Sequence, residues 1–289
     1  MWGAGEKKPR DVQVCIQTWR QVMPDYEIIE INQDDTRWFD FSKNIRHSKF
    51  FKTMYDNRLW AFMADYIRAR VLYDHGGVYF DTDVSAVRPL DGFLDEPAFV
   101  GMQNSMYTEP AILGAAAGNK FLKRVLEFYE NDFWRTPIYT IPEIFRHILE
   151  HDYGITNFPP RDAQDIIRTP DISIYPERVF IPFRADGAFC PECVVADTHT
   201  IHWFGGSWLK SAVIDWMKSK HVNPDAPLDM TRNIVSQTRF SIPGINLGIV
   251  KIVRYPHETV TRLMHMVTMS RVTDKWFYLF GVIPVFKVR

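Results

Sequence analysis

Hydrophobic and polar positions along the first 80 residues alternate between helical and strand spacing. Apolar side chains from Asp11 to Met23 recur at steps of three and four residues, which predicts a helix. The β-forming residues from Tyr26 to Ile31 predict a strand. A second helical pattern runs from Lys52 to His75, Gly76-Gly77 caps its C-terminus, and a strand at Val78–Phe80 follows at once.

The same alternation continues as far as residue 204. The further elements that we expect are strands at 98–102 and 199–204 and helices at 120–131 and 141–151. Because strands and helices alternate, the sequence predicts an α/β domain with a mixed, mostly parallel central sheet. The stretch NPDAP at 223–227 is typical of a boundary, so we expect domains at 1–222 and 223–289, and we expect helical additions toward the C-terminus.

The composition is typical of a folded chain with a large core. Of the 289 residues, 46% are hydrophobic and 15% are aromatic, which argues against global disorder. The three cysteines form no disulfide framework, no run approaches the ~18 apolar residues of a spanning helix, and the N-terminus has no secretory pattern. We therefore expect a cytoplasmic protein.

The C-terminal extension differs in charge from the rest of the chain. Residues 231–289 hold nine Lys or Arg and two Asp or Glu, whereas residues 1–230 hold 25 and 33. The basic groups are interleaved with aromatic and aliphatic side chains, which suits an anionic membrane surface and a peripheral location on its inner face. A subdomain that packs on the first domain or docks a partner is an equally weighted alternative. With a net charge of −1 and no recognised motif, we expect no nucleic-acid binding.

Two carboxylates close the stretch GGVYFDTD at residues 76–83. Side chains at i and i+2 of an extended strand point to the same side, so Asp81 and Asp83 present both carboxylates to one spot. Hard oxygen ligands at a strand end suit Mg²⁺ or Mn²⁺, and ligands bind at open strand ends of α/β sheets. An Asp-rich turn or a helix cap is the alternative, but the strand and amphipathic helix before the acids favour a metal site.

Three segments of the chain together resemble the DXD-motif sugar transferases of glycosyltransferase family 32. Residues 61–84, AFMADYIRARVLYDHGGVYFDTDV, resemble the signature of this group, which includes capsular polysaccharide transferases, outer-chain mannosyltransferases and clostridial glucosylating toxins. Trp2-Gly3 is similar to the family's N-terminal loop, and residues 201–208, IHWFGGSW, are similar to its C-terminal element. The resemblance covers roughly residues 1–215 and implies a GT-A-like, Rossmann-like fold that binds nucleotide sugars.

The resemblance also implies a set of metal ligands. Asp83 would bind the ion directly, Asp81 would hold the ribose or reach the metal through water, and His202 matches the third protein ligand. Mn²⁺ is the expected cofactor, with Mg²⁺ as the alternative, and imidazole is an acceptable ligand for Mn²⁺. The alternative for His202 is a partly buried strand histidine.

The contacts to the donor follow from the same resemblance. Asp65 and Arg68 lie on one helix face and, with Asp83, are the expected catalytic residues. The acid would accept hydrogen bonds from sugar hydroxyls, and the guanidinium would reach the sugar and diphosphate. An exposed ion pair is the alternative.

Two terminal loops complete the implied donor site. Trp2-Gly3 would hold the nucleobase by stacking, and Ser207-Trp208 would close over the diphosphate and metal. The chain has almost none of the β-strand that precedes the first loop in the family. Either the chain is truncated at this point or the base site is built differently.

The Cys190-Pro191-Glu192-Cys193 motif is weaker evidence. A zinc site needs four ligands, and the chain has no second Cys-x-x-Cys motif. A Cys₂His₂ site with His199 and His202 is an alternative to the default of two loop thiols.

The predicted function is metal-dependent, retaining transfer of a hexose from a nucleotide sugar to a hydroxyl of a glycan or lipid-linked glycan, in surface polysaccharide biosynthesis. A UDP-sugar is the favoured donor and GDP-mannose the second. No nucleophile can be named from the sequence. The rival hypotheses are a carbohydrate-binding or scaffold protein without activity, and a metal-dependent phosphohydrolase, which would need more acidic ligands or a phosphate-binding loop.

Overall fold

The structure, a computed structural model, describes residues 7–158, 165–183, 187, 189–205, 211–222, 224 and 228, and the backbone of six strands between 233 and 287. Contacts within the chain divide it into two compact units, Met1–Trp208 and Leu209–Arg289. The domain boundary expected after residue 222 stays a prediction. Among the described helices, none combines the length and the apolar character that crossing a bilayer requires.

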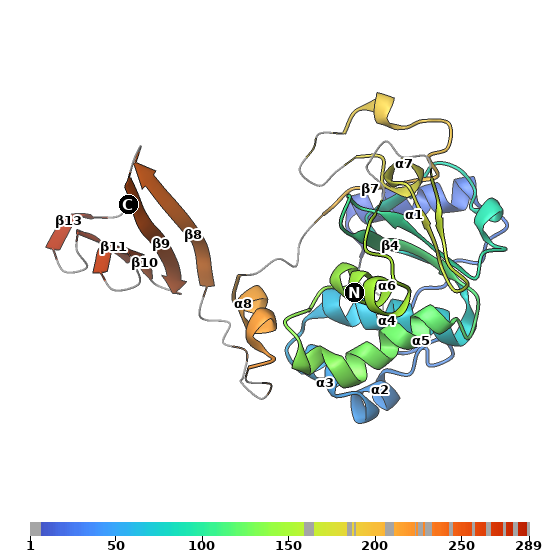
Figure 1. The fold of residues 1–289 in the computed structure, drawn as a ribbon, viewed down its shortest axis with the longest axis horizontal. Helices are drawn as coiled ribbons and strands as arrows, with labels where there is room; N and C mark the ends of the chain where they lie inside the picture. The colour runs from blue at the N-terminus through green and yellow to red at the C-terminus, as the bar shows by residue number, and fades with distance from the viewer. Residues whose placement is uncertain are drawn as a thin grey trace. The chain divides into compact units, whose positions relative to one another are not determined.

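The first unit is built on a five-stranded mixed sheet in the order β1-β4-β3-β6-β5 (Figure 1). Its strands are β1 (Gly77–Phe80), β3 (Ala98–Met102), β4 (Thr108–Ala115), β5 (Ile167–Arg168) and β6 (Ser173–Tyr175). The α/β class and the mixed sheet are confirmed. The expectation of mostly parallel strands is wrong, because β3–β6 pair in parallel but β1–β4, β3–β4 and β5–β6 are antiparallel. The β3–β4 connection is too short for the crossover of roughly a dozen residues that a parallel pair needs.

The single helix expected over 52–75 is two helices, α3 (Lys49–Asp56) and α4 (Trp60–His75). Arg58 adopts a left-handed φ of 56°, and the N–H groups of Arg58 and Leu59 bond back to carbonyls in the last turn of α3. This is a Schellman motif, which usually has glycine at the left-handed position. Arginine there carries no stop signal, so the two helices could not be separated from the sequence.

The other predicted elements of the first unit are mostly confirmed. The remaining described α-helices before residue 200 are α1 (Arg10–Val22), α2 (Phe41–His47), α5 (Lys120–Glu127), α6 (Ile141–Asp152) and α7 (Glu177–Phe180), and a π-helical turn, Phe128–Asp132, continues α5. Helices α4 and α6 pack on the sheet against β1 and β4 (Figure 1). The strand expected at Tyr26–Ile31 is wrong, because this segment pairs with no strand among the described residues and Ile29 is exposed.

A separate two-stranded ladder lies at the end of β1. It pairs β2 (Val84–Ala86) with β7 (Thr200–His202) in antiparallel fashion. Helix α1 packs against β2, where Trp19 Nε1 donates to the Val84 carbonyl oxygen at 2.7 Å. The ladder therefore brings two segments that are distant in sequence to the same edge of the first unit.

The second unit begins with α8 (Ser211–Ser219) and continues as a sheet. The strands are β8 (Asn233–Ile242), β9 (Ile245–Tyr255), β10 (Glu258–Leu263), β11 (Val267–Thr273), β12 (Trp276–Leu279) and β13 (Ile283–Lys287). They pair in sequence order and antiparallel. Helix α8 fits the helical C-terminal additions that we expected, whereas the described residues from 233 to 287 form strands and not helices. Val, Ile and Thr favour strands, and strands so close in sequence pair as hairpins.

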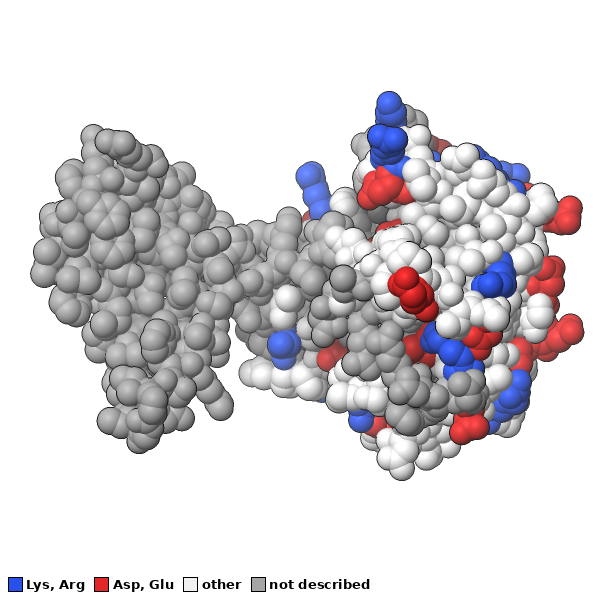
Figure 2. Space-filling view, turned by 90° about the horizontal axis from the view of Figure 1, so that it is seen from above, with Lys and Arg blue, Asp and Glu red and all other residues white. Residues whose placement is uncertain are grey.

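One face of the first unit carries charges of both signs. On the face drawn in Figure 2, acidic and basic side chains of the described residues are interspersed rather than gathered by sign. The described residues on this face therefore form no large patch of a single charge sign.

Candidate metal centre

The two acids of the Asp-Thr-Asp motif lie in the turn between β1 and β2. The Asp81 N–H donates to the Ala111 carbonyl oxygen of β4 at 2.8 Å. The Val84 N–H donates to the Asp81 carbonyl oxygen at 3.1 Å, which closes a four-residue turn. The alternation of an extended strand is therefore not what aligns Asp81 with Asp83. The turn performs that role.

The third residue, His202, reaches the turn through the β2–β7 ladder. It is the last residue of β7, and the next N–H, of Trp203, donates to the Asp83 carbonyl oxygen at 2.9 Å. The chain then bends at Phe204, whose φ of 53° is strained for a bulky residue. The bend returns the Gly205 N–H to Asp83 Oδ2 at 2.8 Å. Backbone bonds thus fix Asp83 beside His202.

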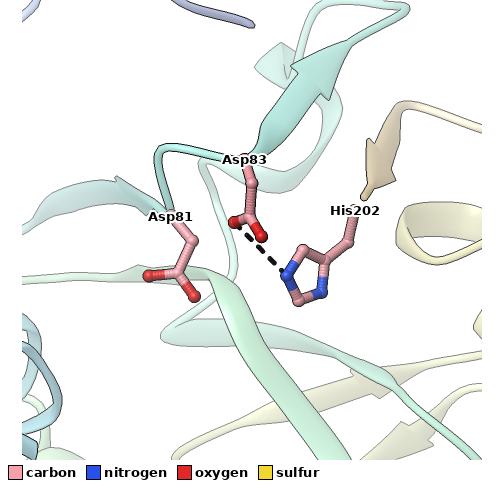
Figure 3. Close-up of side chains that lie close together, drawn as sticks. All are labelled: Asp81, Asp83 and His202. Carbon is pink, nitrogen blue, oxygen red and sulfur yellow. Dashed lines mark ion pairs between the residues drawn. The ribbon is translucent and has the colours of Figure 1, made fainter. Parts of the chain in front are cut away.

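Asp81, Asp83 and His202 converge on one point (Figure 3). One ligand atom from each residue lies within 4.8 Å of the other two, and Asp83 Oδ1 is 3.4 Å from His202 Nε2. An octahedral ion with bonds of about 2.1 Å places neighbouring ligands roughly 3 Å apart and opposite ligands about 4.2 Å apart. Small side-chain movements would therefore let all three residues contact one ion.

Burial and mutual attraction have opposite effects on the pKa values of this pair. Burial favours a raised pKa for Asp83, but the hydrogen bonds from His202 and from the Gly205 N–H lower its pKa below the usual value. Burial favours a lowered pKa for His202, but the Asp83 and Glu109 carboxylates outweigh burial and raise it. The carboxylates around His202 therefore favour a positive charge at this position.

Arg68 is the centre of a buried polar cluster beside the turn. It is 5% exposed, and its guanidinium contacts Asp65 Oδ1 at 2.9 Å and Asp81 Oδ1 at 3.1 Å. It also donates to the Pro110 carbonyl oxygen at 2.7 Å and lies 4.4 Å from the centre of the Tyr79 ring. The alternative of an exposed intrahelical pair is therefore wrong, because the pair is buried and linked to the turn.

Tyr79 completes this cluster and was missed from the sequence. Its hydroxyl donates to Asp81 Oδ1 at 2.6 Å, so Tyr79 and Arg68 both hold that carboxylate. Strand alternation was an available signal, because Tyr79 lies two residues before Asp81. Burial raises the pKa of Asp65 to about 7, Arg68 opposes the rise, and the Asp81 and Glu109 carboxylates add to it.

Glu109 is the second residue that sequence reasoning missed. It lies on β4 with its side chain 12% exposed, and its Oε2 is 3.9 Å from His202 Nδ1. Burial raises the pKa of Glu109, and His202 opposes the rise. No motif marks this residue, because only the pairing of β4 with β1 brings it to the turn.

Other predicted site residues do not join this group. Trp2, Gly3, Ser207 and Trp208 lie outside the residues that the structure describes. Cys190 and Cys193 are free thiols, and His199 Nδ1 is hydrogen-bonded to the Pro89 carbonyl oxygen at 2.7 Å. Across the described ranges, no possible metal-binding group includes either cysteine, so these ranges offer no support for a Cys₂His₂ site.

Comparison with known proteins identifies the segment that contains the turn. Residues 9–100 match the family model described as "Glycosyltransferase sugar-binding region containing DXD motif". Over 104 residues the chain is 33% identical to inositol phosphoceramide mannosyltransferase 3 of Schizosaccharomyces pombe. This matched segment covers 36% of this chain and 28% of that protein. The solved PaToxG glycosyltransferase is 15% identical with a TM-score of 0.43, and the match covers 53% of this chain and 67% of that one.

The matched segment contains most of the described site. Asp65, Arg68, Asp81 and Asp83 lie inside residues 9–100, whereas Glu109 and His202 lie outside. The resemblance to DXD-motif sugar transferases is confirmed for this segment. The chain spans 28% of the length of the curated relative that it matches.

Proposed function

We propose that this chain, which carries the DXD sugar-binding region of glycosyltransferases, is a divalent-metal-dependent glycosyltransferase. It would transfer a hexose from a nucleotide sugar to a hydroxyl of a glycan or lipid-linked glycan, with retention of anomeric configuration. The observation that carries this proposal is the convergence of Asp81, Asp83 and His202 beside the buried Arg68 cluster.

The residues at the turn fit a hard divalent cation. Two carboxylates and one imidazole are a suitable donor set for Mn²⁺, and the carboxylates also suit Mg²⁺. The raised pKa of His202 is evidence that its surroundings favour positive charge. When bound, a dication would neutralise the negative charge that develops on a diphosphate as the sugar leaves.

The side chains around the turn would position the donor. Asp83 and His202 would hold the ion, and Asp81 would face the ribose or a metal-bound water. Asp65 would accept hydrogen bonds from sugar hydroxyls. Arg68 already donates to protein acceptors, so we assign it to holding Asp65 and Asp81 in place and to attracting the diphosphate by its charge.

The name of the Schizosaccharomyces pombe relative guides the choice of substrates. It specifies transfer of mannose and an inositol phosphoceramide acceptor. We therefore place GDP-mannose and an inositol-phosphate lipid first among the pairs to test, ahead of the UDP-sugars and surface polysaccharides that the sequence favoured. Contact of the basic residues in 231–289 with anionic lipid would place the protein at the inner face of a membrane.

Incubation with Mn²⁺ and GDP-mannose, UDP-glucose or UDP-galactose tests this function. Metal-dependent release of nucleoside diphosphate with free or transferred sugar is the expected result, and the anomeric proton signal of the product reports retention. Release of inorganic phosphate alone would identify a phosphohydrolase. Absence of both turnover and nucleotide binding would leave a scaffold protein.

A further inference from the structure

One ring nitrogen of His202 does not face the proposed metal site. A histidine that binds a metal through one nitrogen carries its proton on the other, and the group that accepts this proton fixes the ring. Nε2 of His202 lies 3.4 Å from Asp83 Oδ1, on the side of the turn. Nδ1 is the nitrogen left to carry the proton.

Nδ1 is buried and has no hydrogen-bond partner within the described part of the chain. Burying a polar nitrogen without a partner is unfavourable, so native structures rarely leave one in that state. Glu109 Oε2 lies 3.9 Å away, which is about 1 Å beyond the length of a good hydrogen bond. A small rotation of the imidazole or of the carboxylate closes this gap.

We propose that Glu109 is a positioning residue of the metal centre. Its carboxylate accepts the Nδ1–H of His202 and holds Nε2 toward the ion. This inference rests on the metal site of the proposed function. Strand β4 pairs with β3 at Glu109, opposite Gly101, and with β1 from Ile112 to Ala115, so Glu109 projects from a strand that the sheet holds in place.

Glu109 acts through His202 rather than as a ligand itself. The group whose ligand atoms lie within 4.8 Å of one another contains Asp81, Asp83 and His202, and it does not contain Glu109. A carboxylate that supports a metal-binding histidine raises the basicity of the ring and fixes its orientation. The inferred consequence is tighter metal binding rather than a contact with the reacting sugar.

Titration with Mn²⁺ alone, followed by the EPR signal of the free ion, tests the inference. Glu109→Ala should weaken Mn²⁺ binding about 10–100-fold. Glu109→Gln should weaken it less, because the amide oxygen still accepts a hydrogen bond. Glu96→Gln is the matched control, since Glu96 bonds Ser173 and Tyr175 and is not part of the metal group. It should bind Mn²⁺ like the unmodified protein.

A double-mutant cycle separates positioning from other roles. In a His202→Ala background, Glu109→Ala should cause no further loss of Mn²⁺ affinity. If Glu109→Ala lowered Mn²⁺ affinity equally in the unmodified protein and in the His202→Ala variant, the inference would be overturned. Unchanged Mn²⁺ affinity in Glu109→Ala alone would overturn it as well. Thermal unfolding in EDTA reports folding, and if Glu109→Ala does not fold, the cycle is run with Glu109→Gln.

The two proposals fail in different ways. Mn²⁺ binding that depends on Glu109 through His202, without any sugar transfer, would refute the proposed function and support the positioning role. Transfer that requires Asp83, with Mn²⁺ affinity indifferent to Glu109, would support the function and refute the positioning role.

Discussion

The two sides of the metal centre are built in opposite ways. On the α4–β1 side, Asp81 already accepts hydrogen bonds from the Tyr79 hydroxyl at 2.6 Å and the Arg68 guanidinium at 3.1 Å. On the β2–β7 side, Asp83 is fixed by the Gly205 N–H, and His202 keeps a buried ring nitrogen without a described partner. Changes on the first side should therefore reduce stability, and changes on the second side should reduce ligand binding.

Removing the carboxylate of Asp83 should have the largest effect. Asp83→Ala is expected to lower kcat/KM for the sugar donor about 10³-fold, because the direct metal ligand is lost. The fold should lose about 1–2 kcal/mol, because the hydrogen bonds from the Gly205 N–H and from His202 are both lost. Initial rates and thermal unfolding in EDTA measure the two effects. Retained activity would mean that the metal site lies elsewhere.

Removing Arg68 should reduce the stability of the fold more than removing Asp83 does. Arg68→Ala leaves the Asp65 and Asp81 carboxylates without their cation, which should cost about 3–5 kcal/mol of stability. Arg70→Ala is the matched control on the same helix, because its pair with Asp74 is partly exposed and should change stability by about 0.5 kcal/mol or less. Urea denaturation compares them, and equal losses would contradict the buried cluster.

The pH dependence of stability should show that Asp65 is buried in the polar cluster around Arg68. Its pKa is raised from 3.8 to about 7, so between these values the folded protein holds a proton that the unfolded chain releases. The contribution of Asp65 to stability therefore falls as pH rises through this window, by about 1.4 kcal/mol per pH unit at most, and is constant above it. Asp65→Asn removes this contribution, so the variant should gain stability relative to the unmodified protein as pH rises. A difference that does not change with pH would contradict this assignment.

Replacing the loop thiols should have the smallest effect. Neither cysteine belongs to the metal group, so Cys190→Ser with Cys193→Ser should leave Mn²⁺ affinity unchanged and alter stability by about 0.5 kcal/mol or less. The EPR titration and thermal unfolding used above measure both. Loss of metal binding in this double variant would restore the Cys₂His₂ hypothesis.

The same contrast explains what the sequence could predict of the site. Asp65, Arg68, Asp81 and Asp83 lie in one continuous segment with a recognisable pattern, and the structure brings all four to one place. Glu109 comes from another strand without a motif, and its role depends on strand pairing that periodicity does not specify. Local patterns thus find local parts of a site, whereas supporting residues from other strands require the fold.

The fold itself was predictable to the same degree. Helical periodicity located α1, α5 and α6, because an amphipathic face is written in the local sequence. The end of α3 was not predictable, since Arg58 occupies a left-handed position that usually signals glycine. The antiparallel pairings depend on loop length and on which strands meet, and the segment at Tyr26–Ile31 pairs with none of the described strands.

The central claim is that a divalent cation binds between Asp83 and His202 and contacts the diphosphate of a sugar donor. Anomalous X-ray diffraction from crystals that contain Mn²⁺ and a nucleoside diphosphate tests it most directly. We predict an anomalous peak at a position where a manganese ion is coordinated by Asp83 and His202, with the diphosphate bound to the coordination positions that the protein leaves free. A bound nucleotide with the manganese peak elsewhere, or with no peak at this turn, would contradict the account.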